Sequence, residues 1–88
     1  MAILKTVIVV NLLAGNGSTA RSWPKVAHYA HKRLGPFQAL VTSRPGEATL
    51  FSRRTVESGV YRLICMGRDG TLNEVINGIM TASVRNPK

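Results

Sequence analysis

The chain has 88 residues, enough for one domain with a modest core, and its 12 Lys and Arg against 4 Asp and Glu give a formal net charge of +8. This charge favours anionic partners such as nucleotide phosphates, nucleic acid or an acidic membrane surface, although a solubilising surface would also account for it. No apolar run approaches the roughly 18–20 residues of a membrane helix, and the single cysteine, Cys65, excludes an internal disulfide. We therefore expect one cytoplasmic domain over residues 1–88.

Three strands are predicted, each followed by a helix. Residues 4–11 contain the continuous apolar run 7–10, which is typical of a central strand covered on both faces. The first helix follows from the periodic spacing of Trp23, Val26, Ala27, Ala30 and Leu34. Pro24 fits the first turn of this helix and Gly35 fits its end.

The remaining elements continue the alternation. Residues 36–42 and 60–66 are the second and third predicted strands, and residues 45–59 form a helix that ends at Gly59. The last helix carries an apolar stripe at helical spacing: Leu72, Val75, Ile76, Ile79 and Met80. The order βαβαβα predicts a three-layer α/β fold of Rossmann-like type with a parallel sheet. Its turns at 11–18, 42–46 and 67–71 should meet at one sheet edge.

The first of these turns has the spacing of a dinucleotide-binding turn. Residues 15–20, GNGSTA, match the pattern G-x-G-x-x-G/A, in which glycines allow a pyrophosphate to approach the backbone. No acidic residue precedes Glu47, so the usual ribose-binding acid is missing, although Arg44 could bind a 2′-phosphate instead. A glycine turn that merely joins a strand to a helix is the simpler alternative.

The third turn contains Asp69, the only aspartate of the chain, between Gly67 and Gly70. A carboxylate at the carboxyl end of a parallel strand can bind Mg²⁺ or accept a hydroxyl proton, while nearby backbone N–H groups bind phosphate oxygens. The alternative is structural. Thr71 and Glu74 have the spacing of a capping box, and an aspartate near a helix N-terminus is favoured by the helix dipole alone.

Three segments in order resemble the diacylglycerol kinase catalytic family, which includes bacterial lipid kinases and sphingosine kinases. Residues 11–17, NLLAGNG, resemble the turn N-P-x-A-G-x-G, and residues 42–48, TSRPGEA, resemble T-x-x-x-G-[HED]-A. Residues 67–79, GRDGTLNEVINGI, resemble G-G-D-G-T-x-N-E-V-x-N-G-[IL]. The resemblance extends over nearly the whole chain.

This resemblance implies ATP-dependent, Mg²⁺-assisted phosphoryl transfer to a lipid hydroxyl such as that of diacylglycerol. By matching position, Asp69 would assist the hydroxyl nucleophile or hold the metal. Six further residues would contact the nucleotide or its phosphates: Asn11, Thr42, Gly67, Gly70, Thr71 and Glu74.

The chain departs from the family pattern at two positions. Arg68 replaces the second glycine of the third motif and Leu12 replaces a proline of the first. If position 68 needs a positive φ, arginine is strained there and its side chain enters the phosphate space; alternatively, Arg68 binds phosphate.

The family's second, β-rich domain, which receives the lipid, has no counterpart in these residues. We therefore expect an N-terminal lobe that is inactive by itself and associates peripherally with the inner membrane face once completed. A stand-alone nucleotide- or phosphate-binding module, with homo-oligomerisation covering the open sheet edges, is one alternative, and an inactive structural fragment is another. No recognition helix or basic–aromatic pattern argues for nucleic acid.

Overall fold

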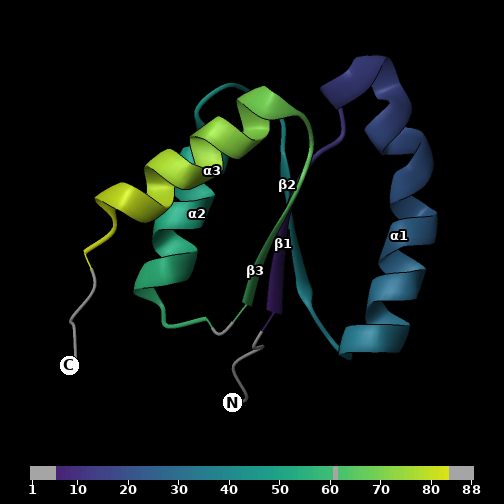
Figure 1. The fold of residues 1–88 in the computed structure, drawn as a ribbon, viewed down its shortest axis with the longest axis horizontal. Helices are drawn as coiled ribbons and strands as arrows, with labels where there is room; N and C mark the ends of the chain where they lie inside the picture. Colours follow the sequence, from purple (N-terminus) through teal and green to yellow (C-terminus); the bar gives the residue numbers. More distant parts are fainter. Residues whose placement is uncertain (1–5, 61, 84–88) are drawn as a thin grey trace.

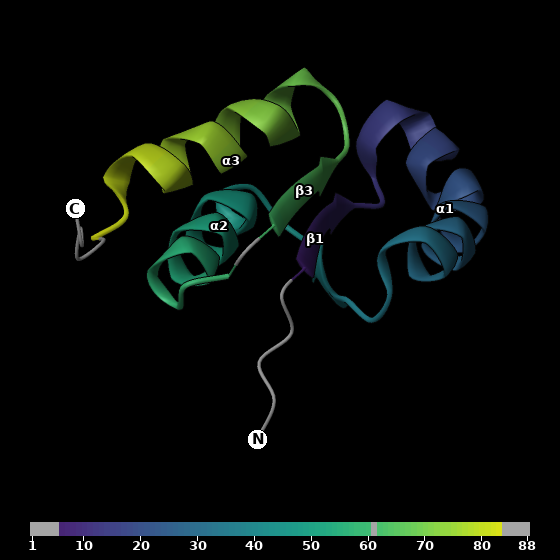
Figure 2. The same ribbon diagram turned by 60° about the horizontal axis from the view of Figure 1, so that its bottom comes forward.

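The computed structural model describes residues 6–60 and 62–83. Its elements, in chain order, are β1 (Thr6–Asn11), the short 3-10 helix η1 (Ala14–Gly17), α1 (Ser18–Leu34), β2 (Gln38–Thr42), α2 (Glu47–Glu57), β3 (Arg62–Met66) and α3 (Asp69–Thr81). All strands are parallel, in the order β2-β1-β3. Helix α1 lies on one side of the sheet, and α2 and α3 lie on the other (Figures 1 and 2). The predicted three-layer βαβαβα fold is confirmed.

Strand β1 forms the centre of the molecule, as its apolar run predicts. Residues 7–10 are at most 5% exposed. Side chains alternate between the two faces of a strand, and Val7 and Val9 face α2 and α3, where they pack with Ala48 and Val75. Cys65 packs against the same cluster, and burial raises the pKa of its thiol. Residues 4 and 5 of the predicted strand lie outside the described residues.

Helix α1 begins at Ser18, so the prediction that Pro24 occupies its first turn is wrong. The residues before the helix explain the difference, because residues 15–17 are all left-handed and turn the chain into helical geometry early. Pro24 is therefore inside the helix, where it has no N–H to donate to the carbonyl of Ala20. The predicted end is confirmed, since Gly35 has a φ of 82° and donates its N–H to the His31 carbonyl at 2.9 Å.

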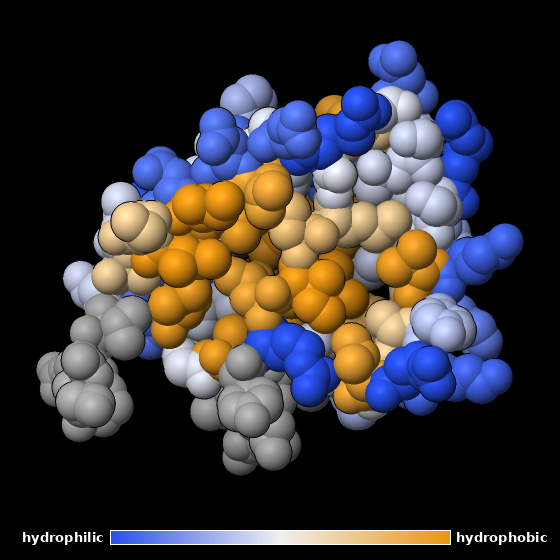
Figure 3. Space-filling model, in the orientation of Figure 1, coloured by the Kyte–Doolittle hydropathy of each residue, from blue (hydrophilic) through white to orange (hydrophobic). Residues whose placement is uncertain are grey.

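Helices α2 and α3 pack against each other through small and polar side chains. The buried residues of α3 are Thr71, Val75 and Gly78, and the hydroxyl of Thr49 in α2 donates to the Glu74 carbonyl at 2.9 Å. The rest of the apolar stripe of α3 is 43–77% exposed: Leu72, Ile76, Ile79 and Met80. Figure 3 shows apolar side chains extending from α3 across the sheet toward α1. Within the described residues, Val75 is thus the one member of the stripe that is fully buried.

Candidate functional site

The three strand-to-helix turns meet at the carboxyl edge of the sheet, as predicted. Asn11 of β1 pairs with Thr42 of β2, and Val10 pairs with Met66, the last residue of β3. A cavity of about 360 Å³ lies at this edge. Its lining comes from all three predicted turns and from two residues beyond them, Ala48 and Glu74: Asn11, Leu13, Ala14, Gly15, Thr42, Ser43, Arg44, Pro45, Ala48, Arg68, Gly70, Thr71 and Glu74.

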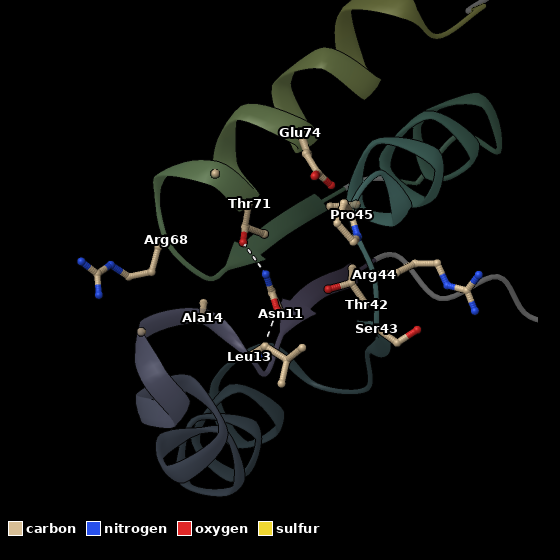
Figure 4. A pocket seen from close by; sticks show the side chains of 13 residues that line it. Asn11, Leu13, Ala14, Thr42, Ser43, Arg44, Pro45, Arg68, Thr71 and Glu74 are labelled. Carbon is tan, nitrogen blue, oxygen red and sulfur yellow. Dashed lines mark hydrogen bonds between the residues drawn. The ribbon is translucent and has the colours of Figure 1, made fainter.

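Asn11 connects the first turn to the third (Figure 4). Its Nδ2 donates to Thr71 Oγ1 at 3.1 Å, and its Oδ1 accepts the Leu13 N–H at 3.0 Å. The half-buried amide therefore uses both ends to hold residues that are far apart in the sequence. Sequence spacing places Asn11 at this edge, whereas the bond to Thr71 becomes visible only in the fold.

We expect Asn11→Ala to lower the free energy of unfolding by about 1–2 kcal/mol, because two hydrogen bonds are lost and the Leu13 N–H loses its acceptor. Thermal unfolding followed by circular dichroism measures this loss. The control is Asn73→Ala, which removes an exposed asparagine of α3. Equal unfolding temperatures for the two variants would contradict the bridging role of Asn11.

Helix α3 begins at Asp69, so the alternative interpretation of Thr71 and Glu74 as a capping box is wrong. Thr71 is the third helical residue, and its hydroxyl accepts a hydrogen bond from Asn11 instead of capping the helix. The Glu74 carboxylate accepts the N–H of Gly46, at the start of α2, at 3.1 Å. The side chains of Thr71 and Glu74 therefore bond to residues far away in the sequence, and not to the start of α3 as their spacing suggested.

The start of α3 leaves backbone donors available at the cavity. The N-cap residue, Arg68, makes no side-chain capping bond, and the first helical N–H to find a backbone partner is that of Leu72, which donates to the Arg68 carbonyl at 3.0 Å. The N–H groups of residues 69–71 precede it and have no partner within the helix. Gly70 and Thr71 line the cavity. Unpaired N–H groups at the positive end of a helix dipole bind anions such as phosphate.

Gly67 supports this arrangement without lining the cavity. A Cβ at position 67 would collide with the hydroxyl and methyl groups of Thr71, so only glycine allows Thr71 to lie over the end of β3. The predicted phosphate-binding residue Gly67 is therefore adjacent to the cavity wall, where it acts on the placement of Thr71.

Asp69 is exposed at the first position of α3, next to the lining residues Arg68 and Gly70. Its own side chain is not part of the cavity lining. Over residues 6–60 and 62–83, no group of three His, Cys, Asp or Glu side chains lies close enough to hold a metal ion. Mg²⁺ is commonly bound by one or two carboxylates together with the phosphates of a substrate. A single exposed carboxylate beside a helix N-terminus with unpaired N–H groups is compatible with that type of site.

The backbone of Arg68 is not strained. Its φ of −118° and ψ of −169° lie in the extended region, which any residue adopts. The condition under which arginine would be unfavourable here, a positive φ, is therefore not met. Arg68 lines the cavity, and its guanidinium points outward beside the first turn, away from Asn11 and Thr71 (Figure 4).

Glycine is required at two positions of the first turn. Gly15 has a φ of 65° and lines the cavity, and Gly17, with a φ of 89°, is the N-cap of α1. A Cβ on Gly15 would also collide with the Ser18 hydroxyl. Gly15 therefore adds no side chain to the cavity wall, whereas Gly17 lies outside the lining.

The second turn is held by Glu47, whose Oε1 accepts the N–H of Ser43 at 2.6 Å and its hydroxyl at 3.0 Å. Thr42 is buried beneath this turn, and its hydroxyl donates to the Val10 carbonyl at 3.4 Å. Ser43 and Pro45 line the cavity although the sequence motifs give them no specific role, and Arg44, the candidate ligand of a 2′-phosphate, lines it as well. Their position within the predicted turn 42–46 is the signal that would have identified them.

The hydrogen bonds from Ser43 lower the pKa of Glu47. Because the folded-state pKa lies below the unfolded value of about 4.3, this stabilisation is complete above that pH and is lost as the pH falls through the folded-state pKa. We expect the difference in unfolding temperature between wild type and Glu47→Gln to be largest near pH 6 and to shrink below about pH 4. A difference that stays constant across this range would contradict the interpretation.

Comparisons with known proteins agree on one family. The family model described as the diacylglycerol kinase catalytic domain matches residues 5–88. A diacylglycerol kinase from Staphylococcus carnosus is 38% identical over 72 residues, and one from Staphylococcus saprophyticus is 39% identical over 72 residues. Each alignment covers 82% of this chain and 24% of the relative.

Solved structures give the same result. A diacylglycerol kinase crystal structure from Bacillus anthracis superposes with a TM-score of 0.78 at 27% identity, covering 97% of this chain and 31% of that one. The chain thus spans about a quarter of the length of the curated relatives it matches. Within the described segments, none of the helices has the combination of length and apolar character that crossing a bilayer requires.

Proposed function

Because the chain belongs to the diacylglycerol kinase catalytic domain family, we propose that it is the ATP-binding lobe of a lipid kinase that phosphorylates a lipid hydroxyl. The observation that carries this proposal is the cavity formed by all three turns, with free N–H groups of α3 beside it. Positioning and charge stabilisation contribute most to phosphoryl transfer. A cavity with backbone donors and one nearby carboxylate supplies both.

The proposed roles follow from where the side chains lie. Asn11 and Thr42, at the ends of adjacent strands, contact the nucleotide. Gly70 and Thr71 direct backbone N–H groups toward its phosphates. Gly67 acts through Thr71, and Glu74 lines the nucleotide side of the cavity while it fixes the Gly46 turn.

Asp69 is the proposed ligand of Mg²⁺ and the group that assists the lipid hydroxyl. When bound, Mg²⁺ would neutralise phosphate charge and orient the transferred group. Asp69 is the only acidic residue in the first turn of α3, where a negatively charged carboxylate interacts favourably with the helix dipole. A carboxylate in this form can accept the hydroxyl proton or hold the metal, and the structure of the lobe is compatible with either role.

The exposed surface of α3 supports a further part of the proposal. Leu72, Ile76, Ile79 and Met80 form an apolar stripe next to the open edge strand β3. Stripes and edges of this kind are normally covered. We propose that the whole protein covers them with further polypeptide, including the β-rich domain that receives the lipid, and that this completed enzyme works at the inner membrane face.

A chimera tests this function. Residues 5–83 replace the matching segment of the Staphylococcus carnosus diacylglycerol kinase, and ATP-dependent phosphorylation of diacylglycerol in mixed micelles is measured. We expect activity well above that of the same relative with the segment deleted. A folded chimera that binds Mg²⁺-ATP without phosphorylating lipid would favour a nucleotide-binding module, which remains the second candidate because this lobe alone forms the cavity.

A further inference from the structure

Arg68 occupies a position between two of the turns that form the cavity. It is the N-cap residue of α3, directly before the free N–H groups, and its side chain is part of the cavity lining. A Cβ on Gly15 would lie 3.3 Å from Arg68 Nη1, so the guanidinium rests against the backbone of the first turn. Glycine at position 15 leaves the room in which this guanidinium lies.

The guanidinium is not neutralised by the acidic residue of the cavity. Glu74 is the acid among the lining residues, and its carboxylate points toward the second turn, where it accepts the Gly46 N–H (Figure 4). The hydrogen bonds found in the described part of the chain leave the Arg68 guanidinium without a partner. Arg68 is exposed, so its five donors face solvent at the outer side of the cavity, near Gly15 of the first turn.

We propose that Arg68 binds the polyphosphate of the nucleotide from the rim and, together with the N–H groups of α3, determines the affinity for di- and triphosphates. This inference rests on the proposed function and names the phosphate contact of that site. A planar guanidinium binds two phosphate oxygens at once, which makes such contacts strong and selective for polyphosphate. The side chain that replaces glycine in the third motif is therefore a ligand of the phosphates and does not block their entry.

The experiment measures binding of Mg²⁺-ATP, Mg²⁺-ADP, AMP and Mg²⁺-tripolyphosphate to the 88-residue chain by calorimetry. We expect Arg68→Gln to weaken ATP and tripolyphosphate binding about 10- to 100-fold, with a much smaller effect on AMP. Arg68→Lys should give an intermediate loss because it keeps the charge without the planar fork. Arg54→Gln, an exposed position of α2 outside this cavity, is the charge-matched control and should leave all four affinities unchanged.

The outcomes separate this inference from the proposed function. If ATP binds equally well to wild type and Arg68→Gln, the role of Arg68 is wrong while nucleotide binding stands. If tripolyphosphate binds in an Arg68-dependent manner and ATP binds no better than tripolyphosphate, the anion contact stands and the nucleotide function is wrong. Binding of none of the ligands overturns both. A weaker dependence of ATP affinity on salt concentration in Arg68→Gln than in wild type would support direct contact of Arg68 with phosphate, because the variant places one fewer positive charge next to the phosphates.

Discussion

Asp69→Asn should reduce lipid phosphorylation by the chimera about 100- to 1000-fold. Asparagine keeps the size of the side chain but removes the negative charge that would hold Mg²⁺ or accept the hydroxyl proton. The expected cost in folding free energy is small, about 0.3–1 kcal/mol, because the favourable interaction with the α3 dipole is the term that is lost. Phosphorylation rates and thermal unfolding of the same preparations measure the two effects.

The control for this prediction is Glu57→Gln, which neutralises an acid at the far end of α2, where its carboxylate accepts the Ser83 N–H at 2.8 Å. It should retain nearly full activity. If Asp69→Asn remains as active as Glu57→Gln and merely unfolds at a lower temperature, the only role of Asp69 is to stabilise α3 through its interaction with the helix dipole. Adding Mg²⁺ at increasing concentration distinguishes the two proposed roles of Asp69, since a weakened metal site is partly restored by mass action.

The sequence predicts the sheet well because local composition determines it. The β-branched run at 7–10 is buried only if both faces of its strand are covered. The central position of β1 in the sheet follows directly from this requirement. Parallel strands then bring the turns at 11–18, 42–46 and 67–71 to one edge. The sequence therefore predicts where the site lies, even though it does not predict the hydrogen bonds among the side chains of the site.

The contacts within the site are less predictable because they join residues far apart in the chain. Thr71 and Glu74 have the local spacing of a capping box, yet the bonds from Asn11 and Gly46 determine where both side chains lie. The start of α1 is missed for a related reason. A run of left-handed residues at 15–17 changes the geometry before the periodic apolar positions begin, and Pro24 is tolerated inside the helix.

The glycines of the third motif have different structural roles, which their spacing in the sequence does not distinguish. Gly67 makes room for the Thr71 side chain, whereas Gly70 faces open space and lines the cavity. Gly78, near the end of the motif, is buried where α3 crosses α2. The motif therefore combines one residue at the cavity wall, one next to it and one that sets the packing of the helices behind it.

Gly78→Ala should destabilise the lobe by roughly 1–3 kcal/mol, although alanine is favoured over glycine by about 1 kcal/mol in a helix interior. The added Cβ would collide with the Thr49 carbonyl and would lie 2.8 Å from Ser52 Cβ and 3.0 Å from the Arg53 nitrogen. Two of these atoms belong to the α2 backbone, so the helices must move apart. We expect the unfolding temperature to fall by at least about 5 °C in a domain of this size.

Gly70→Ala is the matched control, since it makes the same change in the same helix at a position where a Cβ meets nothing within 4 Å. Its unfolding temperature should stay equal to that of wild type or rise. Separation of the helices would also weaken the contact of Thr49 with the Glu74 backbone, and with it the bond between Glu74 and Gly46 at the cavity. Gly78→Ala should therefore reduce Mg²⁺-ATP binding at temperatures where the variant is still folded. Unchanged binding by a destabilised Gly78→Ala would mean that the packing of α2 on α3 supports the fold without positioning the site.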